Sequence, residues 1–209
     1  MFVSRTSGAG SDESTLGTNP RGGPPLSNDV ILVDEADRPV GRMGKMEAHE
    51  AGALHRAFSV FLFDGQGRWL LQQRDPRKYH SGGLWTNTCC SHPAPGESTV
   101  DAAAARLLEE MGVTAEIEPA FTFRYRAEFD NGLVEHEFDH VFVGRFDGEP
   151  TPNPVEASDW RWVDTDSLFH ELDEHPERFT YWFREVAERV ARHVDAARVT
   201  DPPTGGPGR

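Results

Sequence analysis

The chain has few of the features that mark secreted or membrane-spanning proteins. Only two of its 209 residues are cysteines, and they are adjacent, Cys89 and Cys90. Neighbouring cysteines cannot join distant segments, so they do not form a disulfide framework. No apolar run is long enough to span a bilayer, and the first residues lack the apolar core of a secretory signal. We therefore expect a cytoplasmic protein without membrane contact.

Basic residues are also scarce. The sequence has 21 Lys and Arg against 35 Asp and Glu, a formal net charge of -14 at pH 7. This excess of negative charge argues against a general nucleic-acid binder, because nucleic acids are bound mainly through their phosphates. An anionic small molecule would have to be held by a local group of basic side chains.

The length predicts one domain, since 209 residues suffice for one hydrophobic core and are too few for two generous ones. Both ends are rich in small polar residues, glycine and proline, without hydrophobic periodicity. Such composition is typical of disordered tails. We expect tails at residues 1–27 and 196–209 and a single domain over residues 28–195.

Alternating apolar runs predict strands, and glycine-containing turns join some of them. Two hairpins are expected, 57–63 with 69–73 and 115–127 with 133–146. Shorter strands are expected at 30–33 and 160–163. Strands mixed with a few helices favour an α/β sandwich over a doubly wound parallel sheet, which needs strict alternation of strand and helix.

Apolar residues recur at helical spacing between residues 100 and 111. Ser98 and Asp101 resemble a capping box at the start of this run, and Gly112 ends it. Residues 166–194 are expected to form two further helices, the second beginning near Pro176, because proline suits a first helical turn.

Histidines and glutamates occur in settings that suggest one metal site. Glu135 and Glu137 are two apart on an expected strand, so their side chains face the same way. Imidazoles with carboxylates suit Zn²⁺, Mn²⁺ or a similar ion. The alternative is that several of the nine histidines are merely solvated and that the two glutamates lie on an exposed strand face. The candidate ligands are His49, His55, His92, Glu135 and Glu137.

Basic residues gather after the strand 69–73. Arg74, Arg77 and Lys78 lie there in one loop, which could hold a diphosphate through charge-assisted hydrogen bonds. The alternative is a loop that only adds solubility. On the expected helix, Arg106 and Glu110 are four residues apart and share a face, so they are expected to form a salt bridge.

The stretch from Ser91 to Val113 resembles a Nudix box, the loop and helix that bind metal and diphosphate in that family. Glu97 occupies the position of the first glutamate, and residues 107–113 match the end of the box. Ser91 stands where the family has glycine, and Arg106 stands where it has a glutamate. Nudix hydrolases use these glutamates to hold metals that activate water. Replacing one of them by a cation argues against hydrolysis.

Five segments together resemble type 1 isopentenyl diphosphate isomerase and follow the order found in that family. They lie within residues 54–63, 70–74, 84–93, 123–127 and 134–137. The resemblance covers about residues 28–185. It implies a Nudix-type α/β/α sandwich with a mixed sheet in a single domain.

The resemblance also assigns roles to particular residues. It implies that Cys90, which lies two residues before His92, and Glu137 are catalytic, and that Tyr125 and Trp182 assist them. It identifies the five candidate metal ligands above as the ligands of a tightly bound ion, Mn²⁺ or Zn²⁺, and Glu110 as a residue that helps to hold Mg²⁺ on the substrate. The implied contacts to the diphosphate are Lys45, Arg74, Lys78, Ser91 and Arg106.

The implied reaction moves the double bond of isopentenyl diphosphate to give dimethylallyl diphosphate, in isoprenoid biosynthesis. It requires two proton carriers on opposite sides of the substrate and a dry pocket for a tertiary carbocation. The expected partner is this small molecule, and the expected state is a monomer or weak homodimer. Two alternatives stay open here, a Nudix hydrolase of a nucleoside or other diphosphate and a noncatalytic metal-binding module.

Overall fold

The computed structural model describes residues 28–200, so the predicted tail at 1–27 and the end of the other tail, 201–209, lie outside the described residues. The strands are β1 (Asp29–Val33), β2 (Pro39–Gly44), β3 (His55–Phe63), β4 (Trp69–Arg74), β5 (Trp85–Thr86), β6 (Cys89–Ser91), β7 (Ile117–Glu128), β8 (Val134–Arg145) and β9 (Ala157–Val163). The helices are α1 (Lys45–Ala51), α2 (Thr99–Met111), α3 (Thr165–Glu174), the 3₁₀ turn η1 (Pro176–Arg178) and α4 (Tyr181–Thr200).

All the strands belong to one curled sheet in which β3 is central. Along one edge β3 pairs in parallel with β8. Its other edge pairs antiparallel with β1, β6 and β4 in turn. The sheet is therefore mixed, as predicted, and β3 brings strands from distant parts of the chain side by side.

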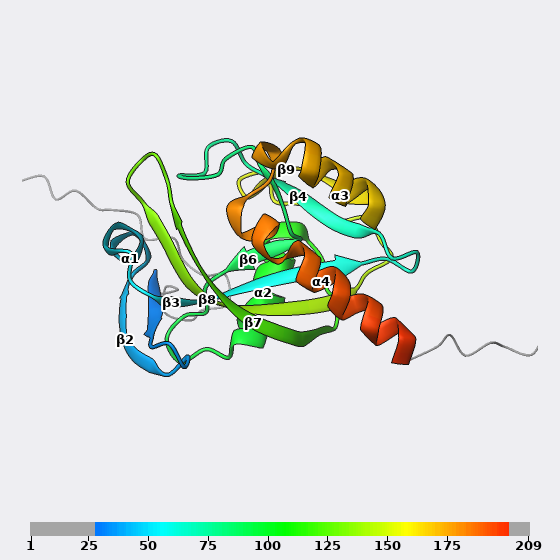
Figure 1. Ribbon diagram of the computed structural model, residues 1–209. Helices are drawn as coiled ribbons and strands as arrows, with labels where there is room; N and C mark the ends of the chain where they lie inside the picture. Colours follow the sequence, from blue (N-terminus) through cyan, green and yellow to red (C-terminus); the bar gives the residue numbers. More distant parts are fainter. Residues whose placement is uncertain (1–27, 201–209) are drawn as a thin grey trace, which may run out of the picture.

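Helices cover both faces of this sheet, which confirms the α/β/α sandwich (Figure 1). Phe58, Val60 and Leu62 of β3 pack in one buried cluster with residues of α2. Phe61 and Phe63 point the other way and pack with residues of α4. Alternate side chains of a strand face opposite sides, so β3 supplies both hydrophobic cores.

The two predicted hairpins are present. β3 pairs antiparallel with β4, and β7 pairs antiparallel with β8 over most of its length. Gly132, in the turn between β7 and β8, has φ of 82°, a left-handed conformation that glycine adopts without strain. The glycine-containing turn predicted between these strands is therefore confirmed.

Helix α2 matches the predicted helix, but its first turn differs from the prediction. Ser98 is the N-cap residue, yet its side chain makes no capping hydrogen bond, so the expected capping box does not form. Gly112 ends the helix with φ of 65°. A β-carbon at this position would lie 2.6 Å from the carbonyl oxygen of Thr151, so glycine is required by space as well as by conformation.

The C-terminal region corrects two further predictions. Pro176 begins the short turn η1, and the last helix, α4, starts only at Tyr181. Proline suits a 3₁₀ turn as well as an α-helix because both leave the first N–H groups unpaired. Helix α4 runs to Thr200, so residues 196–200, which were assigned to the tail, are helical.

Strand β2 and helix α1 were not predicted. Strand β2 lies at an edge of the sheet and has exposed side chains along most of its length, so it lacks an apolar pattern. Helix α1 has only seven residues.

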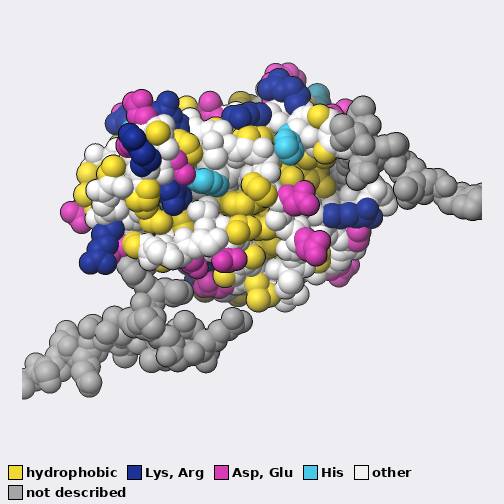
Figure 2. Space-filling model, turned by 90° about the horizontal axis from the view of Figure 1, so that it is seen from below, with side chains coloured by type: hydrophobic (Ala, Val, Ile, Leu, Met, Phe, Trp, Pro, Cys, Tyr) yellow, Lys and Arg dark blue, Asp and Glu magenta, His cyan; other side chains and the backbone are white. Residues whose placement is uncertain are grey.

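Among residues 28–200, no helix is both long and apolar enough to cross a membrane. Acidic and basic side chains are interspersed on the face shown in Figure 2.

Candidate active site

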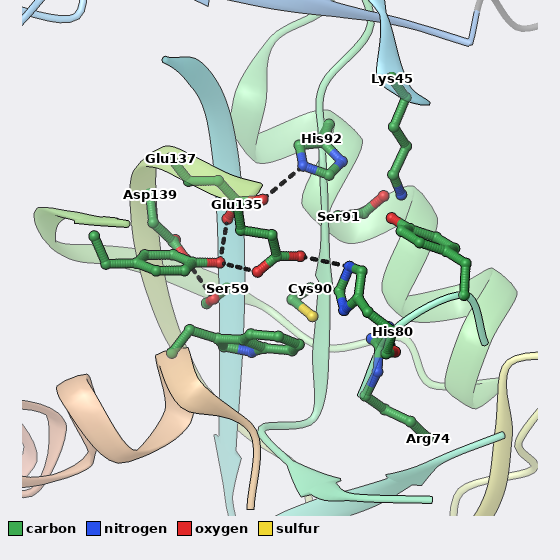
Figure 3. Close-up of a pocket in the computed structure, with 13 residues that line it drawn as sticks. Lys45, Ser59, Arg74, His80, Cys90, Ser91, His92, Glu135, Glu137 and Asp139 are labelled. Carbon is green, nitrogen blue, oxygen red and sulfur yellow. Dashed lines mark hydrogen bonds and ion pairs between the residues drawn. The ribbon is translucent and has the colours of Figure 1, made fainter. Parts of the chain in front are cut away.

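Two adjoining cavities lie beside the central strand β3. The inner cavity is lined by Cys90, Tyr125, Glu135, Glu137 and Trp182 among others. The side chains of Cys90, Glu135 and Glu137 converge on it (Figure 3). The outer cavity is lined by basic residues, and the two share Lys45, Arg74, Tyr79, Cys90 and Ser91.

Strand pairing brings the histidine cluster together. His55 of β3 is in register with Glu137 of β8, and the strand β6 that precedes His92 pairs with the other edge of β3. His49 comes from α1. One ligand atom from each of these residues lies within 4.8 Å of the others, and all four residues are buried or nearly so.

The donor atoms of this cluster are arranged as a metal would need them. His55 Nδ1 lies 2.8 Å from the carbonyl oxygen of Ala53, which leaves Nε2 to face the cluster. That Nε2 lies 3.2 Å from His92 Nε2, which is itself 2.8 Å from a carboxylate oxygen of Glu137. The buried Nε2 of His49 has no hydrogen-bond partner among residues 28–200. Four converging donors, one of them unpaired, fit a divalent ion.

Electrostatics favour the metal-binding forms of His49, His92 and Glu137. For His55, the effect of burial is outweighed by Glu137, which raises the pKa of that imidazole. Burial lowers the pKa of His49 to about 3 and the pKa of His92 to about 4, so both imidazoles are neutral. Burial by itself would raise the pKa of Glu137, but His92 and His55 outweigh it and hold that pKa well below its usual value. Neutral imidazoles and an ionised carboxylate are the forms that ligate metals.

Glu135 is not part of this cluster, although the sequence grouped it with the four ligands. One of its carboxylate oxygens lies 2.8 Å from His80 Nε2. The hydroxyl of Tyr125 donates to Glu135 and to Glu137, at 2.7 Å in each case. Burial, together with these two carboxylates, raises the pKa of Tyr125 well above its usual value, so the phenol keeps its proton. Tyr125 thus joins the two glutamates.

Cys89 and Cys90 belong to different surroundings. Cys89 is fully buried in the cluster of α2, on the face away from the inner cavity. Cys90 lines both cavities. Burial raises the pKa of the Cys90 thiol, although the charge of Arg74 acts in the opposite direction. The thiol is therefore protonated at neutral pH.

All five predicted diphosphate contacts line the outer cavity, together with Glu110: Lys45, Arg74, Lys78, Ser91 and Arg106. Arg106 forms the expected salt bridge with Glu110, at 2.7 Å, and another with Glu109, at 2.8 Å. Lys78 is paired with Glu156. Lys78 and Arg106 are thus both held in ion pairs.

Trp182 closes one side of the inner cavity. Its side chain is 2 % exposed, and its ring centre lies 5.2 Å from the guanidinium carbon of Arg74 and 6.5 Å from the ring centre of Tyr125. An indole face bordering a buried cavity is suited to hold a positive charge.

Four residues of the inner cavity were missed in the sequence: Ser59, Tyr79, His80 and Asp139. His80 stacks on Phe129, with ring centres 4.6 Å apart, besides meeting Glu135. Ser59 donates a 2.7 Å hydrogen bond to Asp139. Burial raises the pKa of Asp139 well above its usual value. The alternation on β8 places Asp139 on the same face as Glu137, and this period of two was the one available signal.

Known proteins resemble this chain in both fold and sequence. The model of the NUDIX domain matches residues 53–183. The solved structure of DR0079 from Deinococcus radiodurans superposes with a TM-score of 0.65 at 22% identity, over 77% of this chain and 98% of that one. A MutT protein from Methanosarcina mazei superposes with a TM-score of 0.57 at 19% identity, over 68% of this chain and 95% of that one. At these identities the structures support the fold alone.

Sequence relatives are much closer. The isopentenyl-diphosphate Delta-isomerase 2 of Aromatoleum aromaticum is 55% identical over 79% of this chain and 87% of its own length. The isopentenyl-diphosphate Delta-isomerase of Burkholderia multivorans is 54% identical over 79% of this chain and 94% of its own. That of Nocardia farcinica is 52% identical over 76% of this chain and 92% of its own. The chain therefore belongs to the NUDIX family and, within it, to the isopentenyl-diphosphate Delta-isomerases.

Proposed function

We propose that this protein interconverts isopentenyl diphosphate and dimethylallyl diphosphate, as a step of isoprenoid biosynthesis. One observation carries the proposal. Cys90 and Glu137 come from strands on opposite edges of β3 and line the same small cavity, which adjoins a second cavity lined by basic side chains. Two proton-handling groups beside a site for a diphosphate are what a shift of a double bond requires.

Cys90 and Glu137 are the proton carriers in this proposal. The reaction adds a proton to one alkene carbon and removes another from a carbon on the far side of the cation. One carrier acts as the acid and the other as the base, and the two exchange these roles in the reverse direction. Tyr125, whose hydroxyl donates to Glu137, orients that carboxylate.

The hydrocarbon would occupy the inner cavity, where its intermediate is a tertiary carbocation. Water would capture this cation, so the bound substrate has to exclude bulk water from this cavity. The face of Trp182 would stabilise the cation by about 2 kcal/mol or more, a magnitude typical of a desolvated cation-π contact. Arg74, near the indole, also lines the outer cavity and would bind the diphosphate.

Basic side chains would hold the diphosphate in the outer cavity. Lys45, Lys78, Ser91 and Arg106 line it with Arg74, and a chain of net charge -14 offers such a site only where cations are gathered. Arg106 forms ion pairs with Glu109 and Glu110. In a hydrolase of this fold, carboxylates at these positions would hold metal. This arrangement favours isomerisation over hydrolysis.

Two divalent ions are part of the proposal. His49, His55, His92 and Glu137 would hold a tightly bound Mn²⁺ or Zn²⁺, with Glu135 as an additional ligand if it leaves His80. Such an ion supplies positive charge that fixes its ligands and keeps the carboxylate of Glu137 ionised. Glu110 would help to hold Mg²⁺ that accompanies the substrate diphosphate.

We further infer a single-domain cytoplasmic monomer or weak homodimer, with no nucleic-acid or membrane partner. The net charge of -14 and the lack of a long apolar segment support this inference. Sedimentation at several concentrations and fractionation of the source cells test it.

One assay tests the function itself. The protein is incubated with isopentenyl diphosphate and Mg²⁺, and both dimethylallyl diphosphate and free phosphate are measured. Formation of the isomer without phosphate is the expected result. Phosphate release without isomer would favour a hydrolase instead, and turnover of neither kind would favour a metal-binding module.

A further inference from the structure

Asn87 lies at the centre of a buried hydrogen-bond network beside the inner cavity. Its Nδ2 donates to the carbonyl oxygens of Cys89, at 2.6 Å, and Val60, at 3.2 Å. Its Oδ1 accepts from Thr86 Oγ1 at 2.8 Å and from Trp182 Nε1 at 3.2 Å. The side chain is fully buried, and two donors and two acceptor positions are all that an asparagine amide has. The amide is therefore fully used.

The network joins the cysteine segment to the first turn of α4. Thr180 N donates to the carbonyl oxygen of Trp85 at 3.0 Å, and the hydroxyls of Thr180 and Thr86 are 2.8 Å apart. Trp85 also forms an isolated bridge with Phe179. These contacts fix the backbone just before Trp182. They leave the rotation of its indole to be set by side-chain contacts.

The indole N–H is the one polar group by which that rotation can be held. A buried indole N–H needs an acceptor, because leaving it unpaired costs the full desolvation of the group. Asn87 Oδ1 is that acceptor. The same amide bonds to the carbonyl oxygen of Cys89, the residue directly before Cys90. One side chain thus ties the position of the indole to the strand that carries Cys90.

We propose that Asn87 is a positioning residue that holds the face of the Trp182 indole toward the inner cavity, and so sets the surface that stabilises the cationic intermediate. The inference rests on the proposed function, since the orientation of the indole matters most when a cation forms beside it. The competing explanation is that Asn87 only stabilises the fold. The two differ in what they predict for the indole and for a cationic ligand.

The first test observes the indole directly and needs no catalysis. The protein is labelled with ¹⁵N-tryptophan, and the Trp182 indole resonance is assigned by its loss in Trp182→Phe. We expect it to shift in Asn87→Ala and to lose its protection from solvent exchange. Thr88→Val is the matched control, because Thr88 is equally buried and bonds to Leu70 and Leu62 but not to Asn87 or Trp182. An unshifted resonance in Asn87→Ala would overturn the proposal.

The second test uses ligands. Isopentyl diphosphate, which is saturated and uncharged at its hydrocarbon end, is compared with a diphosphate ester that carries a tertiary ammonium in place of the cationic carbon. In Asn87→Ala we expect the affinity for the ammonium compound to fall about tenfold, in line with the partial loss of a desolvated cation-π contact, and the affinity for isopentyl diphosphate to change little. Equal losses for both compounds would show that Asn87 merely supports the fold.

Kinetics complete the experiment through a double-mutant cycle. We expect Asn87→Ala to lower kcat about tenfold with KM nearly unchanged, and to add little further loss when Trp182 is already phenylalanine. Independent, multiplicative losses would contradict an action through the indole.

If Asn87→Ala does not fold, the unmodified protein still tests the proposal, since rapid solvent exchange of the Trp182 indole N–H would exclude the hydrogen bond. Failure of the unmodified protein to isomerise would instead refute the proposed function, and the indole measurements would still stand.

Discussion

The side chains of Cys89 and Cys90 lie on opposite faces of the sheet, although one peptide bond joins the two residues. Cys89 is buried among the residues that pack against α2, and its neighbour lines the cavity beside Trp182 and Tyr125. The alternation of strand β6 produces this separation. The Cys89 thiol also interacts with Glu110 of α2.

This separation predicts different effects of replacing each cysteine. Cys90→Ala should lower kcat by about 10²–10⁴-fold, the usual contribution of a positioned acid or base. Cys89→Ala should keep activity within about tenfold of the unmodified protein, since it removes a small buried group and not a proton carrier. Steady-state isomerisation assays on the two variants measure both effects. A larger loss in Cys89→Ala than in Cys90→Ala would show that Cys89, and not Cys90, is the proton carrier.

Glu137→Gln should abolish isomerisation while leaving the fold intact. The amide cannot carry the proton, but it keeps the size of the side chain and can still accept from Tyr125. We expect a loss of about 10²–10⁴-fold in kcat, with an unchanged circular dichroism spectrum. Glu128→Gln is the control, because Glu128 is exposed at the end of β7. Full activity in Glu137→Gln would remove this residue from the mechanism.

Removal of the metal should lower both activity and thermal stability. An ion that binds the folded state and not the unfolded chain raises Tm, so chelation should lower Tm and addition of Zn²⁺ or Mn²⁺ should restore it. Elemental analysis should find bound metal in the unmodified protein and much less in His49→Ala. His175→Ala, at an exposed histidine, serves as the control. Equal metal content in the two variants would contradict a site built on His49.

Alkylation of Cys90 should be slow at neutral pH and should accelerate with rising pH. Burial raises the pKa of this thiol above the ordinary value of 9.0, and only the thiolate reacts. At pH values below this raised pKa, the thiolate fraction, and therefore the rate, should increase about tenfold per pH unit. Iodoacetamide labelling of the Cys89→Ala protein, followed by mass spectrometry, measures it. A rate that levels off below pH 9 would mean that the pKa is not raised.

The helix caps provide a test of stability that is independent of catalysis. The Asp164 side chain accepts from Ser167 N at 2.9 Å at the start of α3, whereas Ser98 makes no such bond at the start of α2. Asp164→Ala should therefore lower the free energy of unfolding by about 1 kcal/mol. Ser98→Ala should change it by less than about 0.5 kcal/mol. Urea unfolding of both variants gives the two values, and equal losses would contradict this assignment of the caps.

Local patterns carried most of the fold prediction. Helix α2 and the β7–β8 hairpin follow from apolar spacing and turn residues, which act over a few neighbouring positions. The predicted helix start at Pro176 was wrong because proline fits the first turn of a 3₁₀ helix equally well. Phe179 and Thr180 then contact Trp85 through their backbone before α4 begins. Strand β2 was missed because an exposed edge strand needs no apolar stripe.

For the site, the sequence by itself determined which residue types are available and some of their directions. The spacing of two between Glu135 and Glu137 predicted that they face the same way, and both do accept from Tyr125. The resemblance to a known family supplied the remaining candidates, in their order along the chain. Such information lies in short segments, because a strand's period and a motif's spacing are local properties.

Tertiary structure alone decided which of these residues meet. The register of β3 with β8 sets His55 beside Glu137, and the packing of α1 brings in His49, which no sequence spacing could have indicated. His80, in a loop that carries no motif, pairs with Glu135. Asn87 likewise met Trp182 across 95 positions of the chain. These contacts depend on how distant segments pack, and packing is a property of the whole folded chain.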